Sequence, residues 1–314
     1  MREPLVPAPT LAPASALVWW LIGYMAWLVD GLGGDIEGGD AYAIASDAVT
    51  IPLLLPDLAQ LVLGAFVGGV CAGLLAMIAD GGRLTSLAAS FAGVTCAVLL
   101  TGIQSTFALN NADAPGYDGG DSFGQALIVV TAAASLLGWS LGVGGSFGRV
   151  PLGIALAGLA GALPMWLGSL VFAIGLDVNS ELLRYVIQYA GAGLLALGLV
   201  TIGISSYRRL FAWPVAIALA WIALPAYSVA GLLGATARWP GQMWEMAGRT
   251  WDVVKTSIPP ENHPADTWLP FAMAILLAMT ISVRLAMRRA AADESEADRS
   301  PVEQSSTTTR SPRL

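Results

Sequence analysis

The sequence predicts an all-α fold: a polytopic integral membrane protein with a bundle of about eight transmembrane helices and an amphipathic interfacial helix on the extracytoplasmic side. Hydrophobic residues make up 56% of the 314 residues, charged residues only 12%, and the mean hydropathy is +0.68. Soluble domains carry about 25% charged residues, which they need to cover their surface. We therefore expect lipid to be the solvent of most of the chain.

Eight apolar runs are long enough to cross the bilayer, since about 17–25 residues are needed to traverse about 30 Å of hydrocarbon. The first run has the shortest apolar core, Leu17–Val29. A secretory signal would end in a small-residue cleavage site, whereas Asp30 and a glycine-rich stretch follow this run. We therefore predict a retained first helix, preceded by a disordered cytoplasmic segment over 1–12. The runs cover approximately 13–32, 57–79, 84–107, 123–143, 151–174, 182–203, 213–235 and 268–287.

Small residues spaced four apart recur in the second, fourth and fifth runs. Lipid gives helices no hydrophobic reason to associate, so close backbone approach at small residues is a main source of helix–helix attraction. The pattern predicts tight helix crossings, and Pro164 and Pro225 predict kinks in the fifth and seventh runs. The predicted packing residues are Gly64, Gly68, Gly69, Gly73, Gly138, Gly142, Gly153 and Gly161.

Aromatic residues mark the expected membrane interfaces. Trp19, Trp20 and Trp27 are interpreted as an aromatic belt around the first run. Residues 240–258 have apolar side chains at three- and four-residue spacing, which is typical of an amphipathic helix. We expect this helix to lie in the outer interface, with Trp244 and Trp251 at headgroup depth.

The end of the chain has a different composition. From residue 290 it is rich in Ala, Ser, Thr and charged residues, with almost nothing apolar to bury. A disordered cytoplasmic tail is therefore predicted for 290–314, which leaves 13–289 as the transmembrane bundle.

Arginine placement predicts the orientation, because short loops rich in Arg and Lys are retained in the cytoplasm. Alternate connections and the flank of the last run carry arginine, while the other connections are rich in Asp and Glu. We therefore predict a multi-pass cell-membrane protein with both termini in the cytoplasm. The arginines concerned are Arg83, Arg149, Arg208, Arg209, Arg284, Arg288 and Arg289.

Charge also excludes several classes of function. The formal charge of −7 disfavours a nucleic-acid partner, which needs a basic face. No Asp, Glu, Lys, Arg or His lies in the middle third of any predicted span, which disfavours ion-coupled carriers and cation channels with an acidic ring. Cys71 and Cys96 both lie inside apolar runs, and no cysteine–histidine metal spacing occurs.

Uncharged polar residues suggest a route for a solute. Gln104, Gln125, Gln188 and Tyr185 lie toward the predicted outer side of the third, fourth and sixth runs. We expect them to line an outward vestibule, although hydrogen bonding between helices would also explain them. The favoured function is a permease or channel-like protein for a neutral or weakly polar solute.

Acidic outer loops offer the one candidate cation site. Gly-Gly-Asp occurs at 33–35, 38–40 and 119–121, and clustered carboxylates can bind Ca²⁺ or Mg²⁺. Solvated acidic loops that obey the orientation rule explain the same residues without a metal. The candidate ligands are Asp35, Glu37, Asp40, Asp118 and Asp121.

Two further functions stay open. A non-catalytic subunit or scaffold of a membrane assembly would bind a protein partner through the outer amphipathic helix or through an exposed small-residue seam on the second or fifth run. A metal-assisted membrane transferase would use the acidic first outer loop. The sequence leans against an enzyme, assigns no catalytic residue, and predicts no cofactor other than a cation at those loops.

Overall fold

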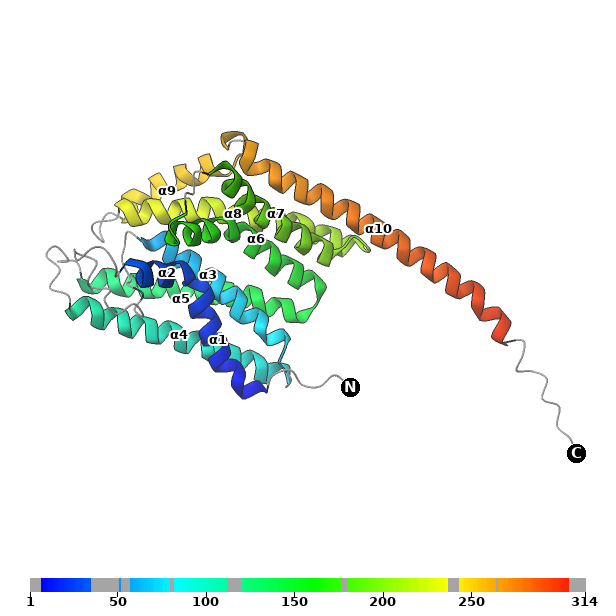
Figure 1. Cartoon of the computed structure of the whole chain (residues 1–314), viewed down its shortest axis with the longest axis horizontal. Helices are drawn as coiled ribbons and strands as arrows, with labels where there is room; N and C mark the ends of the chain where they lie inside the picture. The colour runs from blue at the N-terminus through cyan, green and yellow to red at the C-terminus, as the bar shows by residue number, and fades with distance from the viewer. Residues whose placement is uncertain are drawn as a thin grey trace, which may run out of the picture.

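The structure is a computed structural model that describes residues 7–34, 51, 57–79, 82–111, 120–176, 180–236, 243–263 and 265–304. Over these ranges the regular elements are helices (Figure 1). They are α1 (Ala8–Gly23), α2 (Met25–Gly34), α3 (Leu58–Leu74), α4 (Arg83–Asn111), α5 (Gly120–Gly144), α6 (Arg149–Ala173), α7 (Glu181–Ile202), α8 (Tyr207–Thr236), α9 (Met243–Ser257) and α10 (Ala265–Gln304), with short 3-10 turns η3 (Leu75–Met77), η4 (Gly145–Phe147) and η6 (Pro260–Asn262).

Seven stretches of helix are long and apolar enough to cross a membrane, and Pro9–Gly23 is a shorter apolar helix. The predicted all-α polytopic membrane bundle is thereby confirmed. The candidate spans are Leu58–Met77, Arg83–Phe107, Gln125–Phe147, Arg149–Ala173, Glu181–Ile202, Arg209–Ala235 and Thr267–Ala292.

The single helix predicted over 13–32 is wrong, because α1 and α2 are separated at Tyr24. The indole N–H of Trp166 in α6 donates to the carbonyl of Ile22 at 2.9 Å. The hydroxyl of Tyr24 donates to the carbonyl of Leu61 in α3 at 3.2 Å. These tertiary bonds hold the break, so that α2 packs against α6 while α1 packs against α3 and α4.

The helices form two groups that pair in the same order. In the first group α1 packs against α3 and α4, and α3 packs against α5. In the second group α6 packs against α7 and α8, and α7 packs against α10. One buried apolar cluster lies mainly in each group. A smaller buried cluster of Leu63, Val67 and Ala162 joins α3 to α6, and α3 also contacts α8. No repeat in the sequence had indicated this shared pairing.

All eight glycines predicted to pack lie where the backbone of another helix passes within contact distance. On α3 they face both α1 and α5, which places α3 at the centre of the first group. The crossings are Gly64 and Gly68 with α1, Gly69 and Gly73 with α5, Gly138 and Gly142 with α3, Gly153 with α7 and Gly161 with α8. The exposed small-residue seam required by the scaffold alternative is therefore not formed by these glycines, because the chain's own helices occupy them.

Buried tryptophan–serine hydrogen bonds connect the helices of the first group. Trp19 is 0% exposed, and its indole N–H donates to Ser135 Oγ in α5 at 3.0 Å. Trp139 in α5 donates to Ser90 Oγ in α4 at 3.1 Å, and Ser90 donates to the Ala72 carbonyl in α3 at 3.0 Å. The interpretation of Trp19 as an interfacial belt residue is therefore wrong: it is a core residue with a satisfied polar atom.

The last helix runs further than its composition suggested. A disordered tail was predicted from residue 290, whereas α10 continues to Gln304 and leaves the bundle (Figure 1). Helix nucleation is the costly step, and the span that precedes this segment already supplies the nucleus. Ala, Arg and Glu, which favour helix, then extend it. Similarly, α1 begins at Ala8, inside the segment predicted to be disordered over 1–12.

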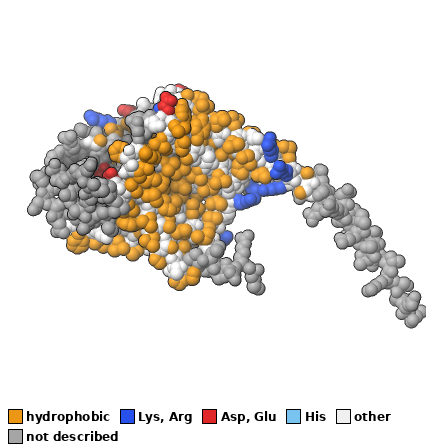
Figure 2. Space-filling model, in the orientation of Figure 1, with side chains coloured by type: hydrophobic (Ala, Val, Ile, Leu, Met, Phe, Trp, Pro, Cys, Tyr) orange, Lys and Arg blue, Asp and Glu red, His pale blue; other side chains and the backbone are white. Residues whose placement is uncertain are grey.

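Arginines from several connections gather at one end of the bundle. Arg83 donates to the Ser146 carbonyl at 3.5 Å and lies over the Phe147 ring. Arg149, Arg209 and Arg289 line one shared cavity. Figure 2 shows basic side chains where α10 leaves the bundle, beyond a broad apolar surface. We call this the arginine end; that it faces the cytoplasm stays a prediction.

Cysteine labelling tests the orientation. In a variant without Cys71 and Cys96, a cysteine at the exposed Tyr207, which lies at the arginine end, should react with a membrane-impermeant maleimide only in inside-out vesicles. A cysteine at the exposed Glu181, at the other end of the bundle, should react only in right-side-out vesicles. Labelling of both positions from the same side would overturn the predicted threading.

Candidate functional site

The residues predicted to form a vestibule are not brought together. Gln104 on α4 and Gln125 on α5 are exposed, and these helices belong to the first group. Gln188 is half-buried on α7, which packs against α6, α8 and α10 in the second group. Tyr185 is 44% exposed, and the Arg184 guanidinium lies 5.8 Å from its ring centre. Because its residues are divided between two helix groups, this arrangement does not support the glutamine-lined vestibule, which stays a prediction.

The predicted cation ligands fall mostly outside the described residues. Asp35, Glu37, Asp40 and Asp118 are outside them, and only the backbone of Asp121 is described, in the first turn of α5. Over the ranges that the structure covers, no group of three or more His, Cys, Asp or Glu side chains is placed to hold a metal. The cation site and the transferase that depends on it stay hypotheses.

Within the described ranges, the carboxyl group of Asp57 has a pKa that its surroundings raise. Asp57 directly precedes α3 and makes no side-chain capping bond to that helix. Burial raises the pKa of its carboxyl group, since removal from water disfavours the charged form. Within the described residues Asp57 belongs to no group of His, Cys, Asp or Glu side chains that could hold a metal, so this carboxyl group by itself indicates no site.

The amphipathic segment forms α9, which folds back along α8. The indole N–H of Trp221, half-way along α8, donates to the carbonyl of Ile258 just after α9 at 2.7 Å. His263 and Phe271 pack edge-on against the same indole at 5.5 and 5.4 Å between ring centres. The C-terminal end of α9 is thereby fixed against the middle of α8, which the sequence did not predict.

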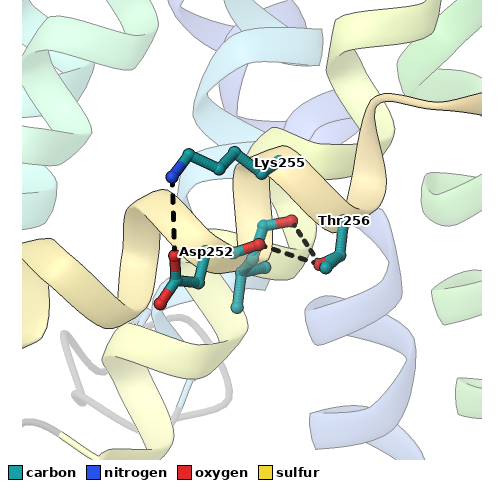
Figure 3. Close-up of polar contacts among 4 residues, drawn as sticks. Asp252, Lys255 and Thr256 are labelled. Carbon is teal, nitrogen blue, oxygen red and sulfur yellow. Dashed lines mark hydrogen bonds and ion pairs between the residues drawn. The ribbon is translucent and has the colours of Figure 1, made fainter.

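The outward face of α9 is polar with one large aromatic residue. Lys255 pairs with Asp252 at 3.8 Å, and the Thr256 hydroxyl donates to the Asp252 carbonyl at 2.9 Å (Figure 3). Trp251 is 59% exposed and lies beneath the Lys255 ammonium group. Exposed ion pairs of this kind contribute little stability. The side chain of Trp244 is outside the described residues, so headgroup contact by the two tryptophans stays a prediction.

A central apolar cavity lies where the two helix groups meet. It has a volume of about 160 Å³ and is walled by α3, α5, α6 and α8. Each of these four helices contributes a lining residue near the middle of its candidate span: Phe66, Leu137, Ala162 and Ile222. The cavity is therefore at mid-depth in the bundle.

This cavity has small residues in its α6 wall, and α5 and α8 leave one of its sides without a close helix–helix contact. Gly158 and Ala162 form part of the α6 wall, where the side chains of Leu141 and Leu219 approach Gly158, and within the described residues α5 and α8 make no extensive contact with each other. Leu137 on α5 and Ile222 on α8 are 65% and 52% exposed. The cavity consequently opens sideways, between α5 and α8, onto the apolar surface that lipid would cover.

The cavity is lined almost entirely by apolar side chains. Tyr227 provides the one side-chain hydroxyl among its lining residues, and none of them is Asp, Glu, Lys, Arg or His. An apolar cavity of about 150 Å³ stays dry and binds small apolar ligands. This cavity can therefore hold part of an apolar molecule, with the tyrosine hydroxyl available to one weakly polar group.

Sequence reasoning could not find the cavity. Gly158 and Ala162 are small residues, as are the packing positions Gly153 and Gly161 on the same helix. Whether such a residue contacts a neighbouring backbone or borders a space depends on where the facing helices lie.

Cys71 and Cys96 are free thiols, half-buried on α3 and exposed on α4.

Comparisons with known proteins add no further constraint. No protein-family model, no curated protein and no solved structure matches this chain. The architecture shown is that of a multi-pass helical membrane protein.

Proposed function

We propose that this protein binds, and moves within or across the bilayer, a neutral and largely apolar molecule taken up from the surrounding lipid. The proposal keeps the permease class predicted from the sequence and changes the solute from a neutral or weakly polar one to a neutral and largely apolar one. It rests on one observation: the mid-depth apolar cavity between α3, α5, α6 and α8 opens toward lipid through the unpaired faces of α5 and α8.

The position of the cavity supports movement as well as binding. It lies between two helix groups whose main buried clusters are different and which a smaller cluster at the cavity joins; relative motion of such groups changes access to a site between them. No Asp, Glu, Lys, Arg or His lines the cavity, which fits a ligand that carries no charge, because a charged ligand buried at mid-depth would need a partner.

Photolabelling of the full chain in lipid nanodiscs tests binding. The probe is a long-chain fatty alcohol that carries a diazirine on its chain. We expect its crosslinks to concentrate on the peptides that contain Phe66 and Met165, relative to other lipid-facing peptides such as the one containing Leu197, which is 54% exposed. The Tyr227→Phe variant tests whether the hydroxyl contributes to retention of the alcohol.

A cavity-filling variant sharpens this test. Ala223→Phe should reduce central labelling about tenfold, since excluding two methylene groups forfeits about 1.6 kcal/mol. The control is Val215→Phe on the same helix, at a 55% exposed position away from the cavity. Equal central labelling in the two variants would overturn the proposal. If binding is confirmed, exchange of a fluorescent fatty alcohol between the leaflets of proteoliposomes tests movement, and an equal exchange rate in empty liposomes would limit the protein to binding.

A further inference from the structure

A second cavity, independent of the central one, lies at the arginine end. It has a volume of about 380 Å³ and lies among α6, α7, α8 and α10. Arg149, Arg209 and Arg289 line it from three different helices. No carboxylate is among its lining residues, so three cations converge on a space without an acidic partner from the described part of the chain.

A buried polar atom also points to a ligand here. Ser282 on α10 is 5% exposed and lines the cavity. Its hydroxyl oxygen is buried and has no hydrogen-bond partner within the described residues. A buried hydroxyl without a partner costs free energy, and a ligand that accepts its hydrogen bond would remove that cost.

Backbone groups add to the positive character of the cavity. α6 begins at Arg149 after Gly148, which supplies no side-chain cap. Pro151 has no amide hydrogen and the Leu152 amide donates to the Gly148 carbonyl, so the amides of Arg149 and Val150 are the ones without an intrahelical acceptor. Helix N-termini attract anions through these amides and the helix dipole. Ser205, whose hydroxyl accepts a hydrogen bond from Arg209 Nη1 at 2.7 Å, also lines the cavity.

Stabilisation of the C-terminal end of α7 does not account for these groups. That end is negative and also lines the cavity. However, the carbonyls of Leu199 and Gly203 at this end already accept hydrogen bonds from the Gly203 amide at 2.9 Å and from Trp213 Nε1 at 3.2 Å, and Arg209 Nη1 donates to Ser205 Oγ. Because no carboxylate lines the cavity, the charge of its three arginines is available to an anion.

The other wall of the cavity is apolar. Ile202, Leu285 and Ala286 line it at the point where the candidate span of α7 ends at Ile202. A site with cations on its water side and apolar residues on its membrane side matches a phosphate group attached to acyl chains better than it matches free phosphate. We propose that this cavity binds the phosphate headgroup of an anionic phospholipid.

Titration with defined lipids tests the proposal. The full chain is purified in mild detergent, and dioleoyl phosphatidylglycerol or dioleoyl phosphatidylcholine is added in mixed micelles. Retained lipid is counted by native mass spectrometry, and the thermal unfolding midpoint is measured. We expect retention of phosphatidylglycerol and a raised midpoint, with a smaller effect of phosphatidylcholine.

Two double variants with equal charge separate a site from general surface attraction. Arg149→Gln with Arg289→Gln removes two cavity cations, while Arg284→Gln with Arg288→Gln removes two cations from the same end of α10 that do not line the cavity. We expect the first pair to weaken phosphatidylglycerol binding about tenfold more than the second. An equal loss in both would overturn the proposal.

The Ser282→Ala variant provides a second, independent test of the proposal. Without added lipid, Ser282→Ala should leave the unfolding midpoint unchanged or raise it, because it removes a buried hydroxyl without a partner. It should nevertheless weaken phosphatidylglycerol binding several-fold, and unchanged binding would count against the site. If inorganic phosphate gave the same protection with the same dependence on the variants, the site would belong to soluble phosphate and the headgroup assignment would be overturned.

Discussion

Replacing Trp19 with alanine is expected to be among the most destabilising single changes, lowering the free energy of unfolding by about 3–5 kcal/mol. The indole is fully buried between α1, α3 and α5, packs edge-on against Tyr24 at 5.1 Å, and donates to Ser135. The alanine variant would leave a cavity and a serine oxygen that has lost its donor. The thermal unfolding midpoint in mild detergent is the measurement.

Two comparisons isolate the cause. Trp251→Ala removes an indole that is 59% exposed and should change the midpoint little. Trp19→Phe keeps one aromatic ring and loses the hydrogen bond, which in membrane proteins averages about 0.6 kcal/mol, together with part of the buried indole volume. A double-mutant cycle with Ser135→Ala measures this coupling. Equal effects of Trp19→Ala and Trp251→Ala would contradict the buried role.

Replacing Gly138 with leucine should abolish a monodisperse folded bundle. A Cβ at this position would overlap the carbonyl of Phe66 and lie 3.1 Å from the amide nitrogen of Val70, both in α3. Backbone atoms cannot move aside as a flexible side chain can, so α3 and α5 would have to separate. Gly138→Ala is the milder variant, with an expected cost of about 1–3 kcal/mol.

Gly193 provides the matched control. It lies on an exposed face of α7, where an added Cβ would meet nothing within 4 Å. Gly193→Leu and Gly193→Ala should leave the elution profile in size-exclusion chromatography and the unfolding midpoint close to those of the unchanged chain. If the substitutions at both glycines had the same effect, the close crossing of α3 and α5 would not be a source of stability.

Much of the fold could be predicted because membrane solvation acts on each segment by itself. An apolar run of sufficient length must form a helix in lipid, since its backbone polar groups have no other partners. The helices from α3 onward that span the predicted runs follow from this rule, as does the amphipathic α9. The rule does not predict the break between α1 and α2 at Tyr24, because the residues that hold this break, Trp166 and Leu61, are distant from it in sequence.

The candidate site could be predicted much less well. Gln104, Gln125 and Gln188 have equivalent depths along their runs, but depth does not specify which helices are neighbours. The structure places their helices in different groups, and the cavity that it forms instead is lined by Phe66, Leu137 and other apolar residues. No chemical signal distinguishes those residues from ordinary lipid-facing ones.

The sequence by itself determined that this chain is a helical membrane protein and which of its segments are apolar helices, because transfer into lipid depends on the composition of each segment. It also determined that arginines recur at alternate connections. Only the tertiary structure decided that Trp19 is a core residue, that α5 and α8 leave a cavity open to lipid, and that Arg149, Arg209 and Arg289 converge. Each of these depends on which helices become neighbours, and that choice is made by close packing and hydrogen bonds between residues far apart in the chain.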